Sequence, residues 1–126
     1  MIVRVVVAVV AAFVISSLWY VAFGGMLARL SPAYAGGGRT SPWVPVLEVV
    51  RSAVLAIVVA LGCDRLDVDA FGPLVTAALV AWLGFPVVLL SGSVLHEQVP
   101  WRLAAIHAGD WLLKLVAMVL IVGWSW

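Results

Sequence analysis

The sequence predicts an all-α membrane protein with four transmembrane helices in an up-down bundle, and three observations support this prediction. The chain of 126 residues is 66% hydrophobic and only 10% charged, with a mean hydropathy of +1.23. A soluble protein this short has too little interior to hide so much apolar surface. Four apolar stretches are each long enough to cross a bilayer, which takes about 20 helical residues.

We expect the helices at about residues 2–24, 42–62, 72–95 and 100–124, within a single domain that covers residues 1–126. Helices are favoured over a β-barrel because runs such as residues 5–15 are apolar on every side and do not alternate. A helix also satisfies its own backbone hydrogen bonds inside lipid.

The first apolar stretch has some features of a signal peptide. Arg4 precedes the apolar run, and Ala33-Tyr34-Ala35 has the small-residue pattern of a cleavage site. The apolar run is longer than the roughly 7–15 residues of a signal sequence, so we predict a retained transmembrane helix. Residues 25–30 either extend this helix or lie along the membrane interface, and the Gly- and Ser-rich residues 31–41 predict a flexible loop.

Each of the other three stretches has a proline close to its first residue. Proline in the first helical turn loses no hydrogen bond, so these positions are typical of helix starts. The three prolines are Pro42, Pro73 and Pro100, and Ser41 would cap the helix that begins at Pro42. Between these helices we expect a short acidic turn at residues 63–71 and a tight hairpin at residues 96–99.

An even number of crossings places both chain ends on one side of the membrane, here called the terminal side. The segments 25–41 and 96–102 then share the opposite side, here called the loop side. The loop side has Arg29, Arg39 and Arg102, and the terminal side has Arg4 and Arg65. The positive-inside rule therefore slightly favours a cytoplasmic loop side, with both termini outside.

Five ionisable residues occur within the predicted helices, where charge is expensive and commonly serves a partner, a cavity or a transport path. Counted from the prolines that start their helices, Glu48 and Arg51 lie about 9 and 13.5 Å deep. On the same measure His107, Asp110 and Lys114 lie about 10.5, 15 and 21 Å deep. We therefore predict a polar centre between the second and fourth helices, with Arg51 paired to Asp110 and Glu48 paired to His107 or Lys114.

The other two helices are expected to support this centre. Ser16, Trp19 and Tyr20 lie near the loop-side end of the first helix. In the third helix Pro86 removes one backbone hydrogen bond and obstructs the carbonyl of Trp82. We expect a kink there that leaves a free acceptor near Lys114.

Two functions follow from a polar centre of this kind. The favoured hypothesis is a structural or oligomer-forming role, in which ion pairs hold helices together. The alternative is a small proton- or ion-coupled transporter or channel that works as a homo-oligomer, with Glu48, His107 and Asp110 changing protonation or binding an ion. In a third interpretation the side chains of Glu48 and Arg51 extend towards the membrane surface, where their charged groups are hydrated, and have no further role.

Other classes of function have little support. No serine lies in a G-x-S-x-G nucleophile motif, so we expect no enzyme activity. Glu48, His107 and Asp110 lack the spacing of a metal site, and the single cysteine, Cys63, excludes an internal disulfide. We expect no metal and no cofactor. The expected partners are the lipid bilayer and further copies of the chain, and a net charge of +1 gives no reason to expect nucleic acid.

Several short motifs resemble a family of small bacterial membrane proteins catalogued as domain of unknown function 1761. They are Leu18-Trp19-Tyr20 with Phe23-Gly24, Trp82-Leu83-Gly84-Phe85, Pro100-Trp101-Arg102-Leu103 and Ile106-His107-Ala108-Gly109. The family usually has Ser-Pro where this chain has Val21-Ala22, and often an amide at the place of His107. The resemblance implies a four-helix membrane protein and no established activity.

Overall fold

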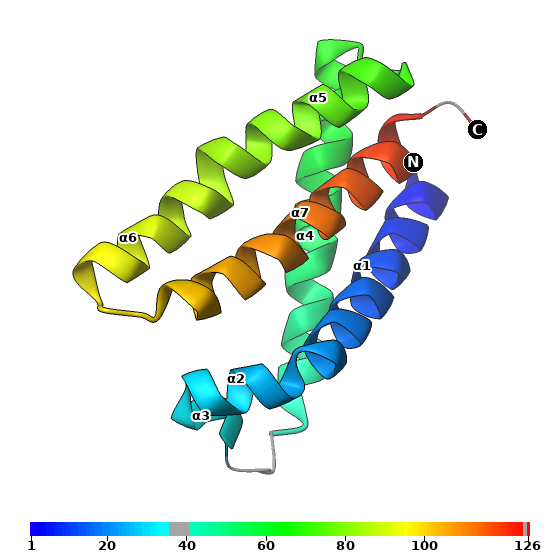
Figure 1. The fold of residues 1–126 in the computed structure, drawn as a ribbon. Coiled ribbons are helices and arrows are strands. Elements are labelled where there is room, and N and C mark those ends of the chain that lie inside the picture. Colours follow the sequence, from blue (N-terminus) through cyan, green and yellow to red (C-terminus); the bar gives the residue numbers. More distant parts are fainter. Residues whose placement is uncertain (36–40, 125) are drawn as a thin grey trace.

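The structure is a computed structural model that describes residues 1–35, 41–124 and 126, and these residues form helices joined by short connections (Figure 1). The helices are α1 (Ile2–Ala22), α2 (Gly24–Leu30), α3 (Pro32–Ala35), α4 (Trp43–Leu66), α5 (Phe71–Trp82), the π-helix η1 (Leu83–Val87), α6 (Val88–His96) and α7 (Trp101–Gly123). α5, η1 and α6 follow one another without a break and form the third span. Arg39, which contributed to the predicted orientation, lies outside the described residues.

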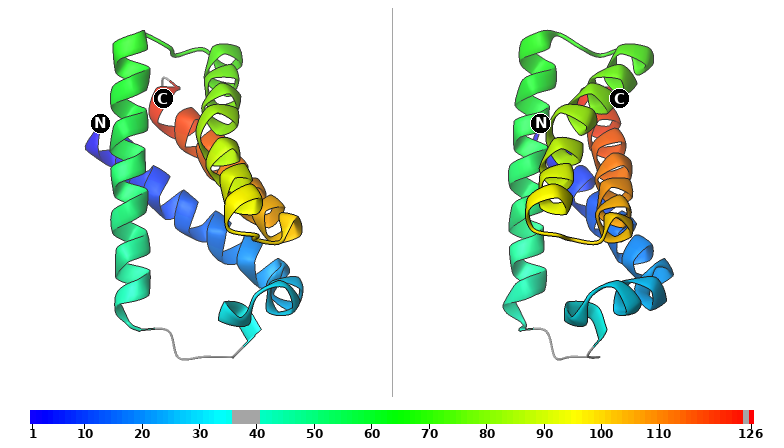
Figure 2. Two further views of the ribbon diagram at one scale, coloured as in Figure 1. Left: turned by 90° about the vertical axis from the view of Figure 1, so that its left-hand side faces the viewer. Right: turned by 60° about the vertical axis from the view of Figure 1, so that its left-hand side comes forward.

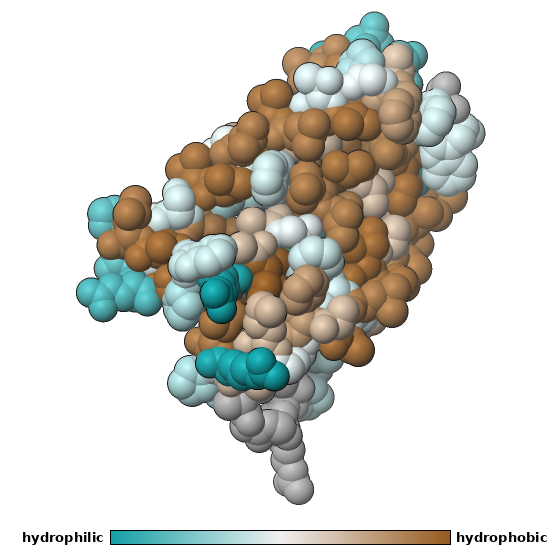
Figure 3. Space-filling model, viewed as in Figure 1, coloured by the Kyte–Doolittle hydropathy of each residue, from teal (hydrophilic) through white to brown (hydrophobic). Residues whose placement is uncertain are grey.

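Four helical spans are long and apolar enough to cross a membrane, which confirms the predicted fold class. They are Ile2–Ala22, Trp43–Leu66, Phe71–His96 and Trp101–Gly123. Successive spans run in opposite directions, and the two termini lie at the same end of the molecule (Figure 1). Figure 3 shows a mainly apolar surface across the middle of one face, with hydrophilic residues towards its ends.

α7 is the central helix of the bundle. It packs against α1, against α4 and against the third span, whereas α4 packs against α1 and α7. α4 and the third span separate below the turn that joins them and touch each other little (Figure 2). The four spans therefore do not close into a symmetrical bundle, and the pockets described below lie beside α4.

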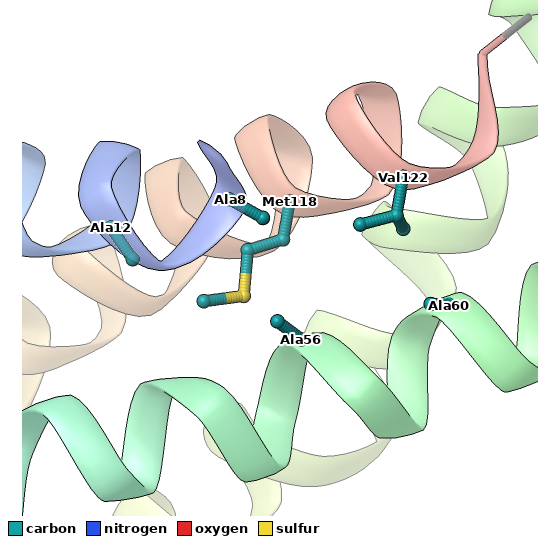
Figure 4. Close-up of a cluster of buried hydrophobic side chains, with 6 residues drawn as sticks. All are labelled: Ala8, Ala12, Ala56, Ala60, Met118 and Val122. Carbon is teal, nitrogen blue, oxygen red and sulfur yellow. The ribbon is translucent and has the colours of Figure 1, made fainter. Parts of the chain in front are cut away.

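Small side chains allow α1, α4 and α7 to approach one another closely in the terminal-side half of the molecule. Six buried residues form this contact, here called the alanine cluster: Ala8 and Ala12 of α1, Ala56 and Ala60 of α4, and Met118 and Val122 of α7 (Figure 4). Met118 extends from α7 into the space between the alanines of the other two helices and has no exposed surface. The cluster is apolar and closely packed.

The helices differ from prediction in three main places, and the first is α3, which occupies residues 32–35 of the predicted loop at residues 31–41. The first span ends at Ala22, and Gly24–Leu30 forms a separate helix whose Leu27 is buried against Leu103 and Ile106 of α7. α4 continues to Leu66, beyond the predicted end at residue 62, because residues 63–66 contain no helix breaker. It stops where Asp67 adopts a left-handed conformation with a φ of 52°. At the start of α4, the Trp43 amide donates to Ser41 Oγ at 3.4 Å.

The third span changes its helical pitch around Pro86. Residues Leu83–Val87 form a π-helix, and Pro86 is buried within it. Proline cannot donate the backbone bond of an α-helix, and in a transmembrane helix a local π-turn can satisfy the backbone groups that it frees. The sequence correctly indicated an irregularity at this position.

Candidate intramembrane binding site

A polar network joins α1 to α7 around the carboxylate of Asp110, which is only 2% exposed. Ser16 Oγ donates to Asp110 Oδ1 at 2.7 Å, and Lys114 Nζ lies 2.9 Å from Oδ2. The Tyr20 hydroxyl lies 3.4 Å from Oδ2 and 2.7 Å from His107 Nδ1. A tyrosine has one hydroxyl proton, so when Tyr20 donates to Asp110 it accepts from His107. The network then runs without a gap from His107 through Tyr20 and Asp110 to Lys114.

The ion pairs differ from those predicted. Arg51 pairs with Glu48 on its own helix, and Lys114 pairs with Asp110 on its own helix. Both pairs have the spacing at which helical side chains meet, three and four residues apart. Because Asp110 faces α1, the predicted Arg51–Asp110 and Glu48–His107 or Glu48–Lys114 pairs are wrong. The polar network therefore lies mainly between the first and fourth spans, and not between the second and fourth.

All five ionisable residues nevertheless line one pocket of about 370 Å³, here called the polar pocket. Ser16 and Tyr20 of α1 form one wall, and Asp110 and Lys114 of α7 form the next. Across the pocket, α4 contributes Glu48, Arg51 and Ser52. The Glu48–Arg51 pair is open to its surroundings, with side chains 45% and 64% exposed, whereas Lys114 is only 11% exposed.

The pocket occupies the loop-side half of the spans. Along each of α1, α4 and α7 its residues lie nearer the loop side than the residues of the alanine cluster. Ala12 belongs to both, so the alanine cluster begins where the pocket ends. Among the described residues, no group of three or more His, Cys, Asp or Glu side chains could hold a metal ion.

The model of a protein family, described as a protein of unknown function, DUF1761, matches residues 3–123 of the chain. The chain belongs to the DUF1761 family. Comparison with curated proteins and with solved structures gives no match.

Segments that suggested the DUF1761 resemblance meet at one level of α7. Trp19 Nε1 donates to the carbonyl of Ile106 at 2.9 Å, and Trp82 Nε1 donates to the carbonyl of Ala108 at 2.8 Å. A carbonyl has two lone pairs, so each can accept an indole proton in addition to its helical bond. Two neighbouring spans of this DUF1761 protein are thus attached to the α7 backbone beside His107.

Gly109 allows the indole of Trp19 to lie against α7. A Cβ atom at this position would come within 2.4 Å of Trp19 Cζ2, closer than non-bonded carbon atoms can approach. The predicted supporting residues Ser16, Trp19, Tyr20 and Trp82 therefore all contact α7 at the level of the polar centre.

Pro86 is placed differently from the prediction. It lines an apolar pocket with Trp111 and Leu115, and Lys114 is not among the residues of that pocket. The amine of Lys114 instead lies against Asp110 and 4.6 Å from the centre of the Trp111 ring. The expected role of Pro86 in supplying an acceptor near Lys114 is therefore not supported by this DUF1761 structure.

The polar pocket also has lining residues that were not predicted, among them Tyr34, Ser52 and Trp111. Tyr34 reaches it from α3, and its ring centre lies 6.4 Å from that of His107. Ser52 and Trp111 follow directly after Arg51 and Asp110 in the chain. Ser52 and Trp111 could have been found from the sequence because each is adjacent to a predicted site residue. Nothing in the sequence shows that α3 brings Tyr34 close to His107.

Proposed function

We propose that this chain is an integral protein of the cell membrane whose polar pocket binds a proton or small ion in coupled transport. The observation that supports the proposal is the pocket itself, about 370 Å³ of space beside the buried carboxylate of Asp110. A purely structural ion pair gains nothing from an adjoining cavity. Ionisable groups that face a cavity at membrane depth are typical of transport and proton paths.

The polar network has the chemistry of a proton relay. His107, Tyr20, Asp110 and Lys114 each carry an acidic or basic group, and hydrogen bonds or an ion pair connect them in series. A proton that enters at His107 can reach Asp110 through the Tyr20 hydroxyl without crossing apolar space. Histidine suits the entry position because its ordinary pKa lies near physiological pH.

The alanine cluster supports a transport cycle with alternating access. It fills the space between α1, α4 and α7 on the terminal side of the network with apolar side chains. A path across the membrane would require these helices to separate there. Four spans enclose little space, so we propose that the transporting unit is a homo-oligomer.

A structural role is the second candidate, and one observation favours it. The acceptors of Asp110 are satisfied by Ser16, Tyr20 and Lys114 of the same chain. Bonds of this kind between transmembrane helices stabilise a bundle by about 1 kcal/mol each. In the first candidate the polar pocket binds a proton or ion, and in the second its residues hold helices together. Neither role is catalytic, so we propose no enzyme activity.

Proton flux into liposomes, measured with a pH-sensitive dye under an imposed potential, separates the two candidates. The proposal predicts flux for the wild type and its loss in Glu48→Gln, which removes the carboxylate that lines the polar pocket across from the relay. That variant keeps a normal midpoint of thermal unfolding because the pair it breaks is exposed. Wild-type liposomes as impermeable as empty ones, together with an Asp110→Asn variant that is strongly destabilised, would leave only the structural role.

A further inference from the structure

The polar pocket continues into two more pockets along α4. A middle pocket of about 380 Å³ shares five residues with it: Glu48, Arg51, Ser52, Trp111 and Lys114. An apolar pocket of about 520 Å³ shares Leu55, Val58 and Trp111 with the middle one. Because each pocket shares walls with the next, the three form one groove that follows α4 from Glu48 to Val59, about 16.5 Å of helix.

The apolar end of the groove exists because α4 and the third span both pack on α7 but touch each other little (Figure 2). Leu55 and Val58 of α4 form one wall, Phe85 and Leu89 of the third span form the other, and Leu115 of α7 lies at the bottom. The volume of this pocket lies within the range of about 300–1,000 Å³ that small-molecule sites occupy.

The groove has the polarity of a membrane lipid. Its charged end, at Glu48 and Arg51, lies on the second and third turns of α4, near the loop-side membrane surface. Its apolar end, at Leu55 and Val58, lies one to three turns deeper. A phospholipid in the loop-side leaflet has its headgroup and acyl chains in the same order.

We infer that this groove binds one phospholipid with a phosphoethanolamine headgroup. Arg51 holds the phosphate, Glu48 accepts hydrogen bonds from the ammonium group, and an acyl chain fills the apolar pocket. The inference rests on the proposed function, in which the polar pocket binds a ligand. The phospholipid would be a second ligand, one that reaches from the polar pocket to the lipid bilayer.

The charges of the groove favour a zwitterionic headgroup. Its charged end presents Arg51 and Glu48 side by side as an ion pair, and both side chains are exposed enough for a headgroup to bind the outer side of the pair. A phosphate followed by an ammonium group matches a cation followed by a carboxylate. An anionic headgroup without an amine would leave Glu48 facing a negative charge, which is unfavourable.

An ethanolamine group fits better than a choline group. Primary ammonium has three N–H donors for a carboxylate, whereas quaternary ammonium has none. Quaternary ammonium is bound instead by free aromatic faces. In the middle pocket Trp111 is the aromatic lining residue, and its ring already has the Lys114 amine 4.6 Å from its centre.

Native mass spectrometry of the full chain in detergent tests the inference. The protein is titrated with phosphatidylethanolamine, phosphatidylcholine and phosphatidylglycerol that have identical acyl chains. We expect at least tenfold tighter binding of phosphatidylethanolamine than of the other two, and Glu48→Gln reduces this preference at least fivefold. Equal binding of the three lipids would overturn the inference.

A blocking variant and a matched control locate the acyl chain. Val58 is 60% exposed and lines the groove, whereas Ile57, the preceding residue of α4, is 46% exposed and lies outside its three pockets. Val58→Trp should weaken phosphatidylethanolamine binding at least tenfold, and Ile57→Trp should leave it unchanged. Unchanged binding to Val58→Trp, or a dimer that replaces bound lipid in the spectra, would refute the inference. Absence of proton flux would contradict the proposed function but not these binding results.

Discussion

Asp110 connects three parts of the polar network, since its carboxylate contacts Ser16, Tyr20 and Lys114. An aspartate at this depth needs compensation for the water it has lost. Its own helix supplies a cation one turn later, and α1 supplies the hydroxyl groups. The strength of the contact between α1 and α7 therefore depends on this one side chain.

Asp110→Asn should lower the free energy of unfolding by about 3 kcal/mol, because it leaves the mostly buried Lys114 ammonium without a counter-charge. Reversible unfolding in mixed micelles of neutral detergent and dodecyl sulfate measures this loss. Glu48→Gln is the matched control, since it breaks an exposed pair and should cost at most about 1 kcal/mol. Equal effects of the two variants would contradict the assigned roles.

Gly109→Ala should lower the free energy of unfolding by about 1–3 kcal/mol, the usual cost of forcing a side chain into filled space. The added methyl group would lie 2.4 Å from the Trp19 ring, which its hydrogen bond to Ile106 holds in place. Gly92→Ala provides the control, because no atom outside the adjoining residues and backbone of its own helix lies within 4 Å of its added Cβ. The same unfolding measurement should show no loss for the control, and a loss there as large as at Gly109 would argue against this contact.

The relative level of the site residues along their helices could be predicted from the sequence, but their partners could not. Helical rise places Arg51 and Asp110 at similar levels, and the two line one pocket. The rise per residue does not determine how each helix is rotated about its axis. Asp110 faces α1 because of the rotation of α7. The sequence spacings of Glu48 to Arg51 and of Asp110 to Lys114 already favoured pairs within one helix.

At the scale of elements, tryptophan side chains fix the positions of neighbouring spans. Trp19 of α1 and Trp82 of α5 each donate an indole proton to the backbone of α7. Their hydrogen bonds reach carbonyls two residues apart, at Ile106 and Ala108. This arrangement orients α7 so that its ionisable residues face the pocket.

Trp82→Phe should lower the free energy of unfolding by about 1 kcal/mol, because it removes the donor and keeps most of the aromatic surface. Trp43→Phe is the control, since Trp43 is 68% exposed. Mixed-micelle unfolding should distinguish the two variants. If both cost the same, the indole bond to Ala108 contributes nothing to the attachment of α5.

The four spans were predictable because each is a long apolar run with a clear start. The prolines before Trp43 and Trp101 stand at the helix starts, which the structure places at these two residues. The end of α4 was less predictable, since the polar residues after Cys63 continue the helix until Asp67 leaves it. The π-helix around Pro86 follows from proline chemistry, but its geometry depends on packing against α7.

The whole molecule divides into two halves along the membrane normal. The loop-side half contains the polar pocket, and the terminal-side half contains the alanine cluster. The uneven packing of α4 adds a lateral groove that connects the pocket to the lipid phase. A closed and dry four-helix bundle would have neither feature.

Accessibility to a membrane-impermeant thiol reagent most directly tests the claim that the polar pocket is a binding site open on one side. Replacing Cys63, the only cysteine, by alanine gives a cysteine-free background for the variants Ser52→Cys and Met118→Cys. Ser52 lines the polar pocket, and Met118 lies fully buried in the alanine cluster. In sealed vesicles of known orientation, we predict labelling of Ser52→Cys from the loop side only and none of Met118→Cys from either side. A Ser52→Cys variant that reacts from neither side would contradict the account and show that the network is sealed from water.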